Sequence, residues 1–105
     1  MEFEEVVKQF QEWQETTFPK ENLQGVINHL KSEIEELDLE LLSFNEFKSE
    51  ERASEELIDI LFLSFYIAKR LDLSLQDITE IMKKKFEINK NRTWELKNGF
   101  YQHIK

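Results

Sequence analysis

The sequence predicts an all-α fold, in which four helices form a bundle and residues 1–105 make a single domain. Along most of the chain, apolar residues recur at three- and four-residue steps, the spacing of one helix face. No stretch alternates apolar and polar residues as a half-buried strand would. The chain also has only two glycines and one proline, the residues that most often interrupt helices.

The first two helices are expected over residues 3–17 and 22–43. The first ends ahead of Pro19, because a proline disfavours a helical residue before it. The second carries a stripe of apolar residues on one face. Its members are Val26, Ile27, Leu30, Ile34, Leu37 and Leu41.

The third helix, over residues 50–71, is apolar in nearly every direction from Leu57 to Ala68. A helix of this kind belongs in the middle of a bundle or at an oligomer interface. Both placements remain open from the residues alone, and an oligomer that associates through this helix is one expectation.

The fourth helix begins with a capping box, in which Ser74 and Asp77 satisfy each other's backbone N–H groups. It is expected to continue to about residue 94. The remaining residues, 95–105, contain Gly99 and are expected to form a short helix or a tail that contacts a partner.

Charge and composition exclude several functions. With 22 acidic and 14 basic residues the chain has a net charge of -8, which disfavours binding of nucleic acid through a basic patch. A phosphate-bearing ligand then needs a divalent cation. The absence of cysteine excludes disulfides and thiolate catalysis. Neither a signal peptide nor an apolar run of membrane-spanning length is present, so a soluble cytoplasmic protein is expected.

Glu56 and Asp59 lie three residues apart where the third helix becomes apolar. Burying a lone carboxylate costs several kcal/mol, so a basic partner, a raised pKa or a metal ion must compensate. A salt bridge to lysine or arginine is the alternative to a metal site. Glu33 and Glu36 have the same spacing on the second helix, and the two pairs can converge.

Four carboxylates on neighbouring helices form an oxygen-only ligand set, which suits Mg²⁺ and also Mn²⁺. His29 lies one turn before Glu33, but neither acidic pair has the Glu-x-x-His spacing of di-iron bundles. This spacing argues against a redox metal.

Basic residues gather on the fourth helix, where Lys85, Asn89 and Arg92 are spaced to share one face. Their ammonium, amide and guanidinium groups are suited to holding phosphate oxygens. The alternative is a solvated positive face.

Three segments resemble the MazG-like all-alpha nucleoside triphosphate pyrophosphohydrolases. Residues 29–37 read HLKSEIEEL, residues 55–62 read EELIDILF, and residues 85–94 read KFEINKNRTW. They follow one another in the family's order, and the small dATP/dGTP- and dCTP-type members are the most similar. The resemblance implies a MazG-type fold and a homodimer or homotetramer, whereas charge and hydropathy are the grounds for expecting no nucleic-acid and no membrane partner.

The resemblance implies Mg²⁺ ligation by Glu33, Glu36, Glu56 and Asp59, and hydrolysis of a nucleoside triphosphate to a monophosphate and pyrophosphate. Glu36 would accept a proton from the attacking water. The remaining roles fall to residues outside the acidic motifs: Lys85 and Arg92 would stabilise the pyrophosphate, with Asn89 adding hydrogen bonds, and Trp13 would stack on the base.

Tyr66, two turns after Asp59 on the same face, is a candidate to line the substrate pocket. Packing in the core is the alternative for both Trp13 and Tyr66. Ser32 replaces an acidic residue that the family often has, which puts any role of that carboxylate in doubt. Two other functions remain open. One is phosphoribosyl-ATP pyrophosphohydrolysis, and the other is a non-catalytic helical module that dimerises through the third helix.

Overall fold

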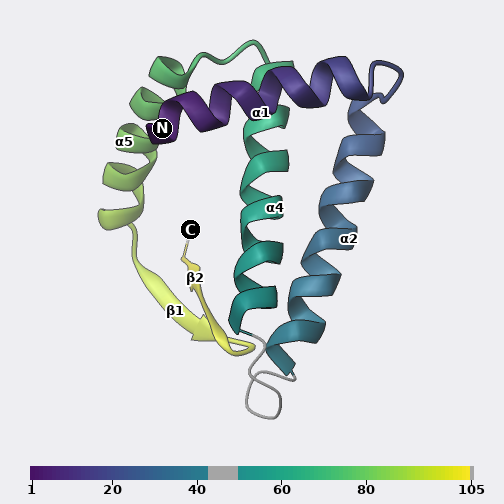
Figure 1. Cartoon of the computed structure of the whole chain (residues 1–105). Helices are drawn as coiled ribbons and strands as arrows, with labels where there is room; N and C mark the ends of the chain where they lie inside the picture. The colour runs from purple at the N-terminus through teal and green to yellow at the C-terminus, as the bar shows by residue number, and fades with distance from the viewer. Residues whose placement is uncertain (43–49, 105) are drawn as a thin grey trace. The chain divides into compact units, whose positions relative to one another are not determined.

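The computed structural model describes residues 1–42 and 50–104 and is mainly helical (Figure 1). The elements are α1 (Phe3–Thr17), α2 (Leu23–Leu42), α4 (Glu50–Arg70), α5 (Leu75–Lys90), β1 (Trp94–Lys97) and β2 (Phe100–His103). The all-α prediction is confirmed, with a small hairpin added. The chain divides into two compact units, Met1–Leu73 and Ser74–Lys105, which we call the first and second unit and describe separately. The single-domain expectation stays a prediction.

In the first unit, α2 and α4 lie side by side and α1 crosses their ends (Figure 1). The core forms where these helices meet. Val26, Leu63 and Tyr66 are its buried residues, and Phe10, Leu30 and Ile67 pack against them. Burying such side chains stabilises the fold by about 1.5–3 kcal/mol each.

A buried glutamine also fixes α1 on α4. The Gln11 side chain is only 7% exposed, and its Nε2 donates a hydrogen bond of 2.8 Å to the backbone oxygen of Phe65. A buried amide without a partner would cost free energy, so this bond fixes the register of the two helices.

The helix ends follow from local chemistry. Asn22 caps α2, because its Oδ1 accepts a 2.8 Å hydrogen bond from the backbone N–H of Gly25. After α4, the chain turns at Asp72, whose φ of 61° is incompatible with a right-handed helix. The predicted end of the second helix at Ser43 lies outside the described residues.

The helix α4 is less enclosed than its composition predicts. Leu57, Ile58 and Leu61 remain 47%, 45% and 42% exposed. Leu61 lies four residues after Leu57 and three after Ile58, so the three side chains share one side of the helix. The first unit therefore buries only part of the apolar surface of α4.

In the second unit, the capping box of α5 is confirmed. Ser74 Oγ accepts a hydrogen bond from the N–H of Asp77, and the Asp77 carboxylate accepts one from the N–H of Ser74. The prediction that this helix reaches Trp94 is wrong, because α5 ends at Lys90.

Of the two expectations for residues 95–105, the short helix is wrong, and the tail that contacts a partner stays a prediction. Strands β1 and β2 pair antiparallel, with Trp94 opposite His103. Asn98 and Gly99 form the turn with φ of 54° and 85°, the left-handed conformation that a two-residue hairpin requires. Asn and Gly adopt this conformation most readily, so the Asn98–Gly99 pair favours a hairpin turn at this point.

Candidate metal centre

Four acidic side chains from α2 and α4 come together in the first unit. Carboxylate oxygens of Glu33, Glu56 and Asp59 all lie within 4.8 Å of one another. Glu36 joins this group through side-chain hydrogen bonds with Glu56 and Glu33. The packing of α2 on α4 thus places the two predicted acidic pairs in one cluster, which we call the carboxylate cluster.

The cluster changes the acidity of two of its members. A side-chain hydrogen bond with Glu56, followed by the charge of Glu56, raises the pKa of Glu36 above its usual 4.5. A hydrogen bond with Glu33, followed by desolvation, raises the pKa of Glu56. Both shifts express the cost of holding several negative charges in one place.

Two oxygen atoms of the cluster lack the partners that buried atoms need. Oε2 of Glu33 and Oε2 of Glu56 are buried and have no hydrogen-bond partner among the residues described. The other oxygen of Glu33, Oε1, lies 3.2 Å from Nε2 of His29. Within the described part of the first unit, no lysine or arginine forms an ion pair with the cluster.

This donor set fits a hard divalent cation. All its ligand atoms are carboxylate oxygens, which Mg²⁺ and Mn²⁺ prefer. A cation would also satisfy the two buried oxygen atoms and reduce the repulsion that raises the pKa values of Glu36 and Glu56. Glu36 is exposed, whereas the Glu33 side chain is only 13% exposed. Glu36 thus lies on the solvent side of the cluster.

Sequence reasoning gave no role to His29. Its imidazole contacts Glu33 and is placed to orient that carboxylate. The signal was present in the sequence, because His29 precedes Glu33 by four residues and such pairs face each other on a helix.

The predicted phosphate-binding residues belong to the second unit. Lys85 and Asn89 lie on α5, but Arg92 follows the helix instead of sharing its face. Nη1 of Arg92 nevertheless donates to Oδ1 of Asn89 at 3.4 Å, so these two residues are neighbours. The approach of Lys85, Asn89 and Arg92 to the carboxylate cluster stays a prediction.

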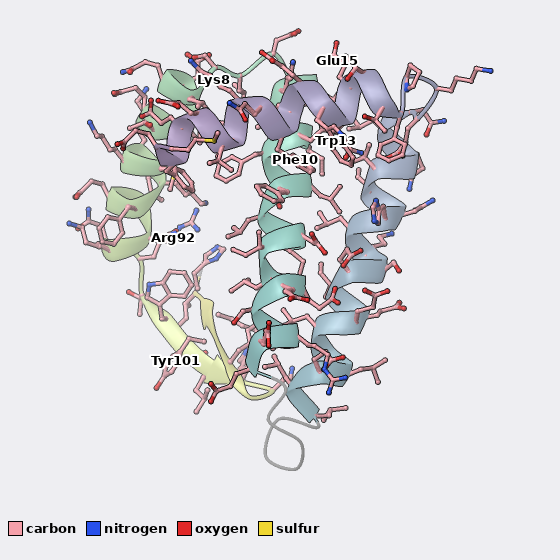
Figure 2. The ribbon with its side chains drawn as sticks, in the orientation of Figure 1. Lys8, Phe10, Trp13, Glu15, Arg92 and Tyr101 are labelled. Atoms are coloured by element: carbon pink, nitrogen blue, oxygen red, sulfur yellow. The ribbon has the colours of Figure 1, made fainter. Side chains whose placement is uncertain are left out.

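The two aromatic candidates of the first unit differ in exposure. The Trp13 side chain is 52% exposed, and its ring lies 5.7 Å from Phe10 and 5.5 Å from Phe18 (Figure 2). It therefore keeps free surface on which a ring can stack. Tyr66 is 3% exposed and belongs to the core, as its packing alternative predicts. Ser32 is exposed on α2.

Comparison with known protein families places nearly the whole chain within one family model. A family model described as dATP/dGTP pyrophosphohydrolase matches residues 6–104. This range includes the four carboxylates as well as the basic residues of α5. Searches of curated proteins and of solved structures found no match.

Proposed function

Because the chain belongs to the dATP/dGTP pyrophosphohydrolase family, we propose that it hydrolyses a nucleoside or deoxynucleoside triphosphate to a monophosphate and pyrophosphate, with Mg²⁺ as cofactor. The observation that carries this proposal is the carboxylate cluster with its two unpartnered buried oxygen atoms. A nucleotide substrate also agrees with a cytoplasmic protein.

Glu33, Glu56 and Asp59 would hold the cation, with Glu36 as a fourth ligand. Their oxygen atoms are close enough to share one ion. Mn²⁺ would fit the same donors. When bound, the metal supplies positive charge that offsets the negative charge developing on the phosphate oxygens.

The protein's own groups then direct the attack of water on the α-phosphorus. As the new bond between oxygen and phosphorus forms, the bond from the α-phosphorus to the bridging oxygen breaks and pyrophosphate leaves. Glu36 would take the proton of the attacking water. Its exposed position supports this role, since it leaves the carboxylate accessible to a water molecule.

Residues of the second unit would bind the leaving group. We assign Lys85 and Arg92 to the pyrophosphate oxygens and Asn89 to a hydrogen bond with the same group. The hydrogen bond between Arg92 and Asn89 supports this assignment, because it orients the guanidinium group before substrate arrives. The exposed part of Trp13 would stack on the base.

We also propose that the protein forms a homodimer or homotetramer. The apolar residues of α4 that stay exposed support this, because a contiguous apolar surface is typical of a protein interface. No helix of the described residues is long and apolar enough to cross a membrane.

A turnover assay tests the proposed reaction. Purified protein is incubated with nucleoside and deoxynucleoside triphosphates and with phosphoribosyl-ATP, with and without Mg²⁺, and the products are separated. We expect monophosphate and pyrophosphate, and loss of turnover on chelation. Asp59→Asn removes one ligand charge and should reduce the rate by about 100-fold or more.

Asp38→Asn is the matched control, since Asp38 is exposed on α2 and outside the carboxylate cluster. It should keep wild-type turnover. Release of orthophosphate would contradict the proposed bond cleavage. If the protein shows no turnover and Mg²⁺ does not change its melting temperature, the non-catalytic helical module is the better account.

A further inference from the structure

The imidazole of His29 contacts the carboxylate cluster from within α2. Its Nε2 lies 3.2 Å from Oε1 of Glu33, one helical turn further along the chain. Side chains four residues apart on a helix are neighbours, so the backbone of α2 keeps the two groups together. Because a carboxylate oxygen only accepts hydrogen bonds, the contact places the proton of the imidazole on Nε2. Within the described residues of the first unit, no other basic side chain makes such a contact with the cluster.

The two oxygen atoms of Glu33 therefore have different surroundings. Oε1 accepts the hydrogen bond from His29, whereas Oε2 is buried without a hydrogen-bond partner among the described residues. The Glu33 side chain is 13% exposed and the His29 side chain 49% exposed. The contact thus joins an accessible imidazole to a carboxylate that is largely enclosed by the protein.

The fold itself gains little from this contact. An exposed pair at this spacing on a helix contributes little to the free energy of unfolding. A free glutamate side chain samples several rotamers, however, and a hydrogen bond to one of its oxygen atoms restricts them. Partners of this kind orient the carboxylates of metal sites, and their loss weakens metal binding. The effect of His29 is therefore expected on the cation and not on the fold.

Cations differ in how much they depend on an oriented carboxylate. Mg²⁺ requires a nearly ideal octahedral arrangement of oxygen atoms at short distances. Ca²⁺ accepts a larger and more variable number of oxygen atoms, and one carboxylate often supplies both of its own. A Glu33 that is fixed before the ion arrives favours Mg²⁺, whereas a Glu33 that turns freely suits Ca²⁺ as well.

We infer that His29 is a positioning residue that gives the carboxylate cluster its preference for Mg²⁺ over Ca²⁺. It acts through Glu33, by holding Oε1 in a hydrogen bond, and is not itself a ligand of the ion. The inference rests on the cation site proposed above and names the residue that determines its selectivity.

The test compares two variants whose side chains are similar in size. His29→Leu removes the donor, whereas His29→Gln retains an N–H group that can reach Glu33. Calorimetric titration of the full chain without nucleotide measures the dissociation constants of Mg²⁺ and Ca²⁺. His29→Leu should weaken Mg²⁺ binding by about tenfold or more and Ca²⁺ binding less, so that the preference for Mg²⁺ falls. His29→Gln should restore part of this preference.

Two controls separate selectivity from stability. The melting temperature of the metal-free protein should be nearly the same in the wild type and in both variants. His103→Leu makes the same change at the chain's other histidine, which is exposed on β2, and should bind both cations like the wild type.

The outcomes distinguish this inference from the proposed function. If the wild type binds Mg²⁺ but His29→Leu keeps the same preference, or loses affinity for both cations equally, the role of His29 is overturned and the metal site stands. A wild-type protein that binds neither cation would overturn the metal site and the inference together.

Discussion

The side chains of Glu36 and Glu56 hydrogen-bond to other carboxyl groups, and this contact favours their protonated forms. A carboxyl whose pKa is raised on folding binds its proton more tightly in the folded state. It therefore favours folding below its ordinary pKa of 4.5, and this contribution is lost as the pH rises through the higher folded-state value. Without metal, the cluster thus opposes folding at neutral pH.

The first prediction concerns one of these residues. Glu36→Gln removes a negative charge from the cluster while keeping a side chain that can hydrogen-bond. In the metal-free protein at pH 7 it should raise the melting temperature, and the gain should shrink as the pH falls towards 4.5. Thermal denaturation in chelator across this pH range measures both effects.

Glu35→Gln is the control for this prediction, because Glu35 is its exposed neighbour and undergoes the same change of charge. A gain of equal size in Glu35→Gln would attribute the effect to the net charge of the protein and not to the cluster. Saturating Mg²⁺ should reverse the order, so that the wild type melts above Glu36→Gln.

At the scale of single elements, α5 depends on its N-terminal cap more than the other helices do. Within the second unit none of its residues is buried, so packing inside that unit contributes little and local hydrogen bonds matter more. Ser74→Ala removes one acceptor of the capping box and should destabilise α5 by about 1 kcal/mol. Amide hydrogen exchange along α5 should accelerate about fivefold as a result.

Ser64→Ala, a serine-to-alanine change on α4, is the control for Ser74→Ala. Ser64 is exposed on α4, and its hydroxyl donates to the Ile60 backbone oxygen one turn earlier. Alanine is the better helix former at such a position, so exchange in α4 should stay the same or slow. Equal acceleration in both helices would show that the cap contributes nothing specific.

The four helices were predictable because their signals are local. Apolar spacing, Pro19 and the Ser74–Asp77 box depend only on neighbours along the chain, and each helix begins within one residue of its expected start, although α5 ends four residues early. The hairpin was missed because each strand has only four residues, so the apolar–polar alternation of Trp94–Lys97 is too short to stand out, and nearly every residue of the two strands is exposed. Its signal was the Asn98–Gly99 pair.

For the candidate site, the sequence predicts which carboxylates come together but not the contacts between their side chains. Two acidic pairs at helical spacing were enough to expect a cluster, since adjacent helices bring such pairs together. The hydrogen bonds that raise the pKa values of Glu36 and Glu56 depend on side-chain positions that no spacing specifies. The sequence also could not place Arg92, because α5 ends at Lys90 and Arg92 therefore lies beyond the helix on whose face it was expected.

For the whole molecule, the prediction concerns self-association through α4. Leu61 is 42% exposed in the single chain. If a second copy covers it, Leu61→Glu buries an uncompensated charge and should weaken association by at least about tenfold. Light scattering over a range of protein concentrations gives the mass of the assembly and its dissociation constant.

Leu71→Glu introduces the same charge beyond the end of α4, at a leucine that is 58% exposed. It should leave the assembly intact. A wild-type protein that stays monomeric at high concentration would contradict the proposed oligomer, and equal dissociation in both variants would place the interface elsewhere.

The division of the chain into two units separates its tryptophans, with Trp13 in the first and Trp94 in the second. Replacing either one by phenylalanine leaves a chain whose fluorescence reports on a single unit. Trp94 donates from its indole to Asn89, so its emission should follow the opening of the end of α5. Trp13 is exposed beside Phe10 and Phe18, so a stacked nucleobase should quench it. The molecule thus carries its own pair of optical reporters, one for ligand and one for unfolding.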